Sequence, residues 1–422
     1  MTPQRNRHRV FLALVAAALF AFGGTGNEAR ADKIKSNPDL VPAGEKDLMG
    51  SHKADQESIK WRPGKGLAVK SGDGKFGLIT RLRLQMLATY EKDDGADAEV
   101  GTMLRRARLQ FIGNTFGKHN KFKAEFAFSP RDLRFTSIDG NNFPRETPLL
   151  TWYMNFDKYR DLTVRAGQYK IPFSRQRVIS SGNQQMVDRS IANGEFNLDR
   201  DIGFDIRSKD LFGAGMFRYY AGVYNGEGRS AFGNGDTNLM YLARFEFLPL
   251  GLFKDYSEGD HQRLAKPGIS IGVGYAYAPN ARGNKVNRSG TPSDGGTTDF
   301  HSVTADLTFK YMGLSLSSEF FLRDTDRNPG AGPVEAARRG YGWFAQAGYM
   351  LPKQPVEFAG RFGQVRGTTD STALGDGNEA GLAVSYYPGQ HPFKLQADAF
   401  QVWSDGSSEG TTRVRVQIQL AF

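Results

Sequence analysis

The sequence predicts an all-β fold, a closed transmembrane barrel of sixteen antiparallel strands. Three observations support this prediction. Apolar and polar residues alternate in many short segments, short and long connections alternate between these segments, and no apolar run near twenty residues follows residues 10–22. A membrane barrel needs apolar side chains only at every second position, so it is compatible with a mean hydropathy of −0.49.

The clearest strand is at the C-terminus, where residues 411–422 read TTRVRVQIQLAF. Apolar residues from Val414 to Phe422 occupy every second position, and Arg413, Arg415 and two glutamines stand between them. Period-two alternation is typical of a strand with one apolar and one polar face. A final strand that ends in Phe also resembles the terminal signature of bacterial outer-membrane barrels.

The N-terminal residues predict export. Three arginines precede the thirteen-residue apolar run 10–22, and Ala29-Arg30-Ala31 has the form of a leader-peptidase site. We expect residues 1–31 to be a signal peptide, residues 32–66 a polar periplasmic lead-in, and residues 67–422 the barrel. A membrane-anchor helix is the alternative for the apolar run, which is short for a bilayer. The chain has no cysteine, which excludes disulfides, thiolate metal sites and thiol nucleophiles.

Alternation recurs along the whole chain. A small hairpin is predicted from residue 66, with its turn at residues 72–74. On the strands we expect Leu82, Leu84, Leu109, Phe126, Val416 and Ile418 to face lipid. The sixteen predicted strands are residues 76–90, 101–113, 121–128, 149–156, 162–169, 202–209, 216–225, 238–248, 269–278, 300–311, 314–323, 340–350, 356–366, 379–387, 393–403 and 412–422.

The connections between these strands fall into two sets. The short set comprises residues 114–120, 157–161, 210–215, 312–313, 351–355 and 388–392, with 249–268 as a long exception. The opposite set is longer and comprises residues 129–148, 170–201, 226–237, 279–299 and 324–339. Short periplasmic turns and long outer loops are typical of outer-membrane barrels. A soluble all-β array gives no reason for this asymmetry.

The polar faces of four strands are rich in cations. Closure of the barrel would place the last strand beside the first, so that these strands share one lumenal wall with a single inward acid, Glu125. Lys and Arg linings are typical of anion pores, and the Arg guanidinium suits phosphate oxygens. The alternative is that the cations are solvated and balanced by acids from loops. The cations are Arg81, Arg83, Arg106, Arg108, Lys121, Lys123, Arg413 and Arg415.

Arg105 departs from this pattern, because its parity places it outward, where we expect it near the outer rim and the lipid head groups. The net charge is +10, and loss of residues 1–31 removes four Arg and one Glu, which leaves +7. A positive excess favours anionic partners.

Several stretches resemble one family. Residues 105–109 read RRARL, residues 164–174 read VRAGQYKIPFS, residues 199–203 read DRDIG and residues 222–226 read GVYNG. From about residue 66 to residue 422 the chain resembles the phosphate-selective porin O/P family. The resemblance implies a trimeric sixteen-stranded porin, with the third loop 170–201 folded into the lumen and a ladder of Arg and Lys that guides anions. It adds Arg165, Lys170, Arg175 and Arg177 to the expected pore lining.

We therefore expect a passive porin for small anions, with phosphate or polyphosphate as candidates, in the outer membrane of a Gram-negative bacterium. A general or neutral-solute porin is the main alternative, and an adhesin or structural barrel is another. An enzyme is not expected, because only His301 of the six histidines lies on a predicted strand and no acid–His–Ser arrangement follows from spacing. We expect no metal, cofactor or nucleic-acid partner, and expect contacts with outer-membrane lipid and a homotrimer.

Overall fold

The structure is a computed structural model. It describes the backbone of residues 58–133, 135–138, 141–144, 147–231, 238–283, 285–286, 293–332, 336–368, 372–406 and 409–422, and the side chains of these residues except those between 134 and 146. The expected signal peptide and residues 32–57 of the expected lead-in lie outside the described residues. All that follows concerns the unit formed by Asn37–Phe422.

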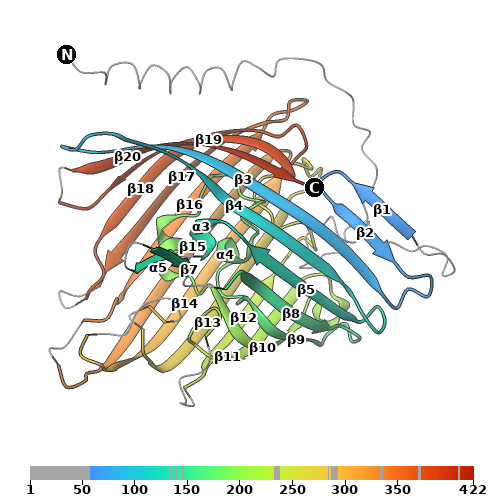
Figure 1. The fold of residues 1–422 in the computed structure, drawn as a ribbon, viewed down its shortest axis with the longest axis horizontal. Coiled ribbons are helices and arrows are strands. Elements are labelled where there is room, and N and C mark those ends of the chain that lie inside the picture. The colour runs from blue at the N-terminus through green and yellow to red at the C-terminus, as the bar shows by residue number, and fades with distance from the viewer. Residues whose placement is uncertain are drawn as a thin grey trace. The chain divides into compact units, whose positions relative to one another are not determined.

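Sixteen of the described strands form a closed antiparallel barrel, as predicted (Figure 1). Each strand pairs with the next along the chain, and β20 pairs with β3 to close the ring. The strands are β3 (Gly77–Asp93), β4 (Glu99–Asn114), β5 (Asn120–Ala127), β8 (Leu149–Phe156), β9 (Thr163–Lys170), β10 (Arg200–Ser208), β11 (Phe217–Tyr224), β12 (Met240–Phe247), β13 (Gly268–Ala281), β14 (Thr297–Tyr311), β15 (Leu314–Asn328), β16 (Gly340–Met350), β17 (Val356–Gly367), β18 (Gly377–Tyr386), β19 (Phe393–Trp403) and β20 (Gly410–Ala421).

The alternation of side chains sets the two faces of the sheet. In β20, Ile418 is 50% exposed on the outer face, whereas Gln417 and Gln419 on the lumenal face are nearly completely buried. Ile418 pairs with Met86 of β3, whose side chain is also exposed on the outer face. The predicted parity of the first and last strands is therefore confirmed.

The strand boundaries agree closely with the prediction at the periplasmic ends and less well at the outer ends. β8, β16 and β19 have the predicted bounds, whereas β13 and β15 continue to Ala281 and Asn328. The extra residues of β15 are mostly polar, because the strand continues beyond the height at which its outer face needs apolar side chains.

A hairpin precedes the barrel. β2 (Gly66–Lys70) pairs with residues 77–80 of β3, as the predicted turn requires, and β1 (Ser58–Arg62) pairs with β2. β1 lies within the segment 32–66 that the sequence predicts to be a polar periplasmic lead-in. The sequence analysis did not predict this strand.

The remaining elements are short. The connection after β5 contains α3 (Pro130–Leu133) and the two-stranded sheet of β6 (Phe135–Ile138) and β7 (Asn141–Pro144), and η1 (Leu211–Gly213) follows β10. α4 (Arg175–Val178) and α5 (Ile191–Phe196) lie between β9 and β10. Among the described residues, we find no helix of the length and apolar character needed to cross a membrane.

The hydrophobic core lies inside the ring of strands. Phe173 and Phe196, from the connection between β9 and β10, pack on Phe321 of β15 together with Tyr169 and Phe300. Figure 1 shows α4 and α5 within the ring. Interior side chains therefore pack against an internal loop in one part of the lumen.

Candidate pore constriction

The connection between β9 and β10, residues 171–199, is here called the lumen loop. Ser174 caps α4 by accepting a hydrogen bond from Arg177 N, and Ser190 caps α5 by accepting one from Asn193 N. Such caps satisfy backbone donors that a short helix leaves unpaired. They fix the two turns that give the lumen loop its shape.

Inward carboxylates hold the lumen loop against one half of the wall. Glu319 of β15 accepts a hydrogen bond from Arg175 N at 2.9 Å, Asp398 of β19 accepts one from Val187 N at 3.0 Å, and Glu379 of β18 accepts one from Ile191 N at 3.1 Å. Charge-assisted hydrogen bonds of this kind are stronger than neutral ones. The lumen loop therefore covers the wall from β15 to β19.

A buried charge network lies under the start of the lumen loop. Arg175 Nη1 is 2.7 Å from Asp255 Oδ2 and Arg175 Nε is 2.5 Å from Asp306 Oδ1. Arg218 of β11 and Arg244 of β12 share these acids and Glu246. Arg175 was predicted to line the pore, but its guanidinium is enclosed by carboxylates and stabilises the loop against the wall.

The opposite wall contains a bulge that the sequence pattern did not reveal. The pairing of β3 with β4 shifts between Gln85 and Met86, which pair with Arg106 and Leu104. Arg105 therefore has no cross-strand pairing partner in β3. The extra residue of a bulge changes the parity of the strand. The prediction that Arg105 faces the outer rim is wrong, because its side chain is 1% exposed and forms an ion pair with Asp188 of the lumen loop.

Asp188 is the acidic centre of this wall. It pairs with Arg105, lies 3.8 Å from Arg106 Nη2 and lies 3.3 Å from Arg415 Nη1. Burial alone would raise the pKa of the Asp188 carboxyl, but the three guanidinium groups outweigh burial and hold this pKa below its ordinary value. Asp188 is therefore ionised and joins the lumen loop to β4 and β20.

The wall and the lumen loop together form what we call the basic cluster. It has ten basic residues and four carboxylates among the described residues, a formal excess of six positive charges. The cations come from β3, β4, β5, β9, β10, α3 and the lumen loop. The members are Arg83, Arg105, Arg106, Arg108, Lys123, Arg131, Lys170, Arg177, Arg189 and Arg200, with Glu125, Asp132, Asp188 and Asp199.

Carboxylates neutralise only part of this cluster. Arg108 contacts both Glu125, at 3.2 Å, and Asp132, at 2.8 Å. Lys170 Nζ instead donates to the carbonyl oxygen of Ile179 at 3.1 Å, and Arg189 donates to backbone carbonyls of the lumen loop. Burial and the charge of Arg177 lower the pKa of Arg189 to about 9, so Arg189 remains charged at neutral pH.

The cations continue towards the periplasm. In the register of β4 and β5, Glu125 pairs with Gln110, Lys123 with Ile112 and Lys121 with Asn114, which places the two lysines successively lower in the lumen. Lys121 Nζ lies 2.5 Å from Asp157. The next cation below the basic cluster is therefore held in an ion pair.

Arg165 lies on the neighbouring part of the wall. Its guanidinium carbon is 3.9 Å from the centroid of the Tyr153 ring, and its Nε donates to Asn155 Oδ1 at 2.7 Å. The cation–π contact orients the guanidinium without a carboxylate. Arg165 therefore keeps its charge in the lower lumen.

The other predicted cations occupy different positions. Arg83 donates to Ser180 Oγ at 2.8 Å, Arg81 donates to the carbonyl oxygen of Lys65, and Arg413 pairs with Glu91 at the outer end of β3. Arg415 pairs with Asp398 at 2.7 Å, so the wall has more acid partners than Glu125 alone. Arg81 and Arg413 therefore lie at the two ends of the predicted wall, and Arg83 and Arg415 lie in its middle.

Several functional residues were missed. Arg131 and Asp132 belong to α3, and no strand periodicity signals their approach to the wall. Arg189 and Arg200 lie in the expected third loop 170–201, where alternation along a strand does not single them out. No group of three His, Cys, Asp or Glu suited to a metal ion occurs among the described residues.

A closed barrel with basic side chains along its lumen is the architecture of an outer-membrane porin. Residues 80–422 match the family Phosphate-selective porin O and P, and the chain belongs to this family.

One relative matches this chain in sequence, and two solved structures share its fold. An uncharacterized protein of Aquifex aeolicus is 24% identical over 317 residues, which are 68% of this chain and 71% of that protein. The barrel is also similar to an anion-selective porin from Comamonas acidovorans, with a TM-score of 0.54 and 12% identity over 82% of this chain and 100% of that chain. The outer-membrane channel DcaP of Acinetobacter baumannii has a TM-score of 0.52 and 12% identity over 84% of this chain and 99% of that chain.

Proposed function

We propose that this porin passes small oxyanions such as phosphate by passive diffusion, and that the basic cluster selects them. The observation that carries the proposal is the formal excess of six positive charges in the basic cluster. Two of its basic residues, Lys170 and Arg189, hydrogen-bond to backbone carbonyls and not to carboxylates. Several cations in one narrow lumen act together on a passing anion. Arg side chains are also suited to the oxygens of phosphate.

The lumenal surface supports the anion preference more directly than it supports phosphate. Arg108 is already held by Glu125 and Asp132, and Arg105 by Asp188, so the charges available to a permeant are fewer than the number of arginines suggests. This observation favours a general anion porin as the second candidate. The two candidates differ in whether phosphate binds inside the pore.

The proposal includes a homotrimer in the outer membrane, reached after removal of residues 1–31. Family membership supports the outer membrane and the trimer, and the residues before Asp32 support the removal. The contacts described above assign no catalytic step to any side chain, and we propose that the protein acts only as a channel. Cross-linking in mild detergent would test the trimer. A cross-linking pattern that shows only monomer would count against it.

Reversal potential in planar bilayers under a KCl gradient tests the anion preference. We expect chloride to be more permeant than potassium. Phosphate is then titrated against the chloride current, with sulfate and a neutral sugar as comparisons. A saturable block by phosphate alone would support the oxyanion site, an equal weak effect of phosphate and sulfate would favour the general anion porin, and a preference for potassium would refute the proposal.

A further inference from the structure

The connection between β12 and β13, residues 248–267, is long although it lies at the end of the barrel where the other connections are short. We call it the periplasmic loop. Its residues Phe253, Asp255, Ser257, Glu258 and Asp260 are all buried. Polar residues of a turn that extended into the periplasm would be exposed, so this loop folds into the lumen.

The inner end of the periplasmic loop meets the lumen loop. Glu258 N donates to the carbonyl oxygen of Asn183 at 2.9 Å, and Glu258 Oε2 accepts from Gln185 N at 2.8 Å. Asp255 forms the 2.7 Å ion pair with Arg175. The periplasmic loop therefore contacts the lumen loop near its start and again at its centre.

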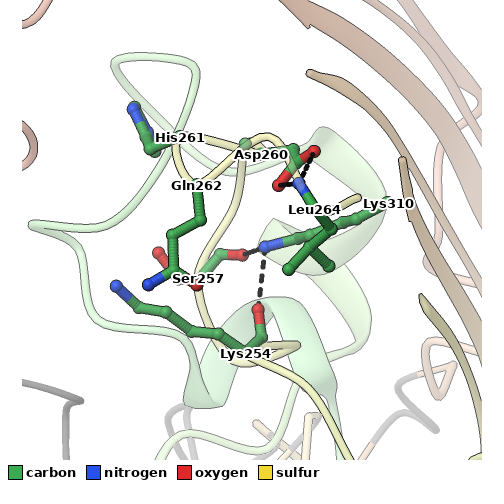
Figure 2. A pocket seen from close by; sticks show the side chains of 8 residues that line it. Lys254, Ser257, Asp260, His261, Gln262, Leu264 and Lys310 are labelled. Atoms are coloured by element: carbon green, nitrogen blue, oxygen red, sulfur yellow. Dashed lines mark hydrogen bonds between the residues drawn. The ribbon is translucent and has the colours of Figure 1, made fainter. Parts of the chain in front are cut away.

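Other residues of the periplasmic loop are fixed to the barrel wall, as Figure 2 shows. Lys310 of β14 donates to the carbonyl oxygens of Lys254 and Ser257, and Asp260 accepts from Leu264 N within the loop. Asp260 Oδ2 also accepts from Gly313 N at 2.8 Å. The periplasmic loop is thus held by the lumen loop on one side and by the barrel wall on the other.

The contacts of the lumen loop explain why its support matters. Residues 183–185 are held by Glu258, and Asp188 and Arg189 follow three to four residues later in the basic cluster. Arg361 of β17 donates to the carbonyl oxygens of Asp188 and Arg189. A shift at Gln185 would therefore move two charged members of the cluster relative to the opposite wall.

We propose that the periplasmic loop is a lumenal brace, and that Glu258 is a positioning residue that sets the anion selectivity of the basic cluster without contacting the permeant. The inference rests on the proposed anion selectivity. The buried Glu258 carboxylate accepts from Gln185 N at 2.8 Å and from the Gln346 side-chain amide of β16 at 3.1 Å, so it links the lumen loop to the wall. Such a carboxylate holds a well-defined position, because losing its hydrogen bonds leaves a buried charge without partners. The brace fixes the lumen loop from below while Asp398 and Glu379 fix it from the side.

A charge-preserving substitution separates positioning from electrostatics. Glu258→Asp keeps the charge and shortens the side chain by one methylene, so an electrostatic role predicts unchanged selectivity. For Glu258→Asp we expect the chloride-over-potassium ratio to fall at least about twofold. We also expect the open-channel current fluctuations to increase. Glu258→Gln removes a negative charge, so electrostatics alone would raise the anion preference, whereas loss of the brace would lower it. Glu99→Asp, at the outer end of β4, is the matched control and should leave both readouts unchanged.

Cross-linking provides a second test, since the chain has no cysteine of its own. In the double variant Asn183→Cys and Glu258→Cys, we expect low noise and an anion preference no lower than that of the wild type when the disulfide is oxidised, and higher noise with a lower anion preference after reduction. Failure of the two cysteines to cross-link would overturn the contact between the loops. Wild-type behaviour of both the reduced double variant and Glu258→Asp would overturn the brace. If the wild-type pore itself prefers potassium, the proposed function fails instead, and the current fluctuations and cross-link yield still report on the brace.

Discussion

Replacing Arg106 and Arg108 with Gln should reduce the anion preference of the pore and leave the barrel folded. Both side chains lie on the lumenal face of β4, and their loss lowers the excess charge of the basic cluster from six to four. Arg108 also pairs with Glu125 and Asp132. Its removal therefore takes one cation from Asp132 and one from Glu125, which keeps Lys123 at 3.6 Å.

The size of the effect follows from Coulomb's law. At an effective dielectric constant of about 20, one charge ~10 Å from an anion contributes roughly 1.7 kcal/mol. Screening over ~10 Å at ~0.1 M salt lowers this contribution to roughly 0.6 kcal/mol. Two charges then contribute about 1.2 kcal/mol, which corresponds to a roughly sevenfold fall in the partition of chloride into the lumen. Potassium changes in the opposite direction, so the chloride-over-potassium ratio should fall by at least this factor.

The assay is reversal potential in planar bilayers at several ionic strengths. The difference between wild type and the double variant should shrink as salt increases. Arg413→Gln is the matched control, because Arg413 pairs with Glu91 at the half-exposed outer end and should change the ratio much less. An unchanged ratio in a double variant that forms normal pores would refute the reasoning and favour the general porin.

Three further predictions follow from the loops. Asp188→Asn should raise the anion preference in the same assay, since Arg105, Arg106 and Arg415 lose their shared carboxylate; an equal or lower preference would contradict this. Arg175→Met should destabilise the seated lumen loop by roughly 1–3 kcal/mol, because Asp255 and Asp306 lose one charge-assisted partner and keep Arg218 and Arg244, and protease cleavage within the loop should become faster than in wild type. Burial, with the nearby lysine charges, lowers the pKa of His261 to about 3. When the periplasmic loop is released from the lumen, His261 would bind a proton near its ordinary pKa of about 6.5. The packing of this loop in the lumen should therefore become less stable as pH falls from about 6.5 towards 3. Current fluctuations should rise in that window, and a pore equally quiet at pH 7 and pH 4 would argue against this linkage.

The sequence was sufficient to predict the strands and their inward faces, but not the residues that the inward side chains contact. Lipid and lumen impose a period of two on every strand, so the inward positions of Arg106 and Arg415 could be predicted from alternation alone. The bulge at Arg105 has no such signature, because one unpaired residue changes parity without changing composition.

The acids of the constriction were harder to place. Asp132 and Asp188 reach the wall from connections whose paths depend on tertiary contacts. The length of the connection before β13 was visible as an exception, but its burial follows only from contacts such as that of Glu258 with Gln185. Periodicity describes what faces the lumen from the wall, and it does not describe what fills the lumen.

The hairpin before the barrel has a consequence for the seam at which the sheet closes. β20 and Phe422 cover β3 only from Leu82 onward, and β2 covers residues 77–80 on the same edge. Without β2, the first residues of β3 would present unpaired backbone groups to which a strand of another molecule could add. The new edge belongs to β1, which carries Lys60 and Arg62, and charged residues on an edge discourage such addition. A chain shortened to begin at Gly77 should therefore form the same pore but aggregate more readily while it refolds.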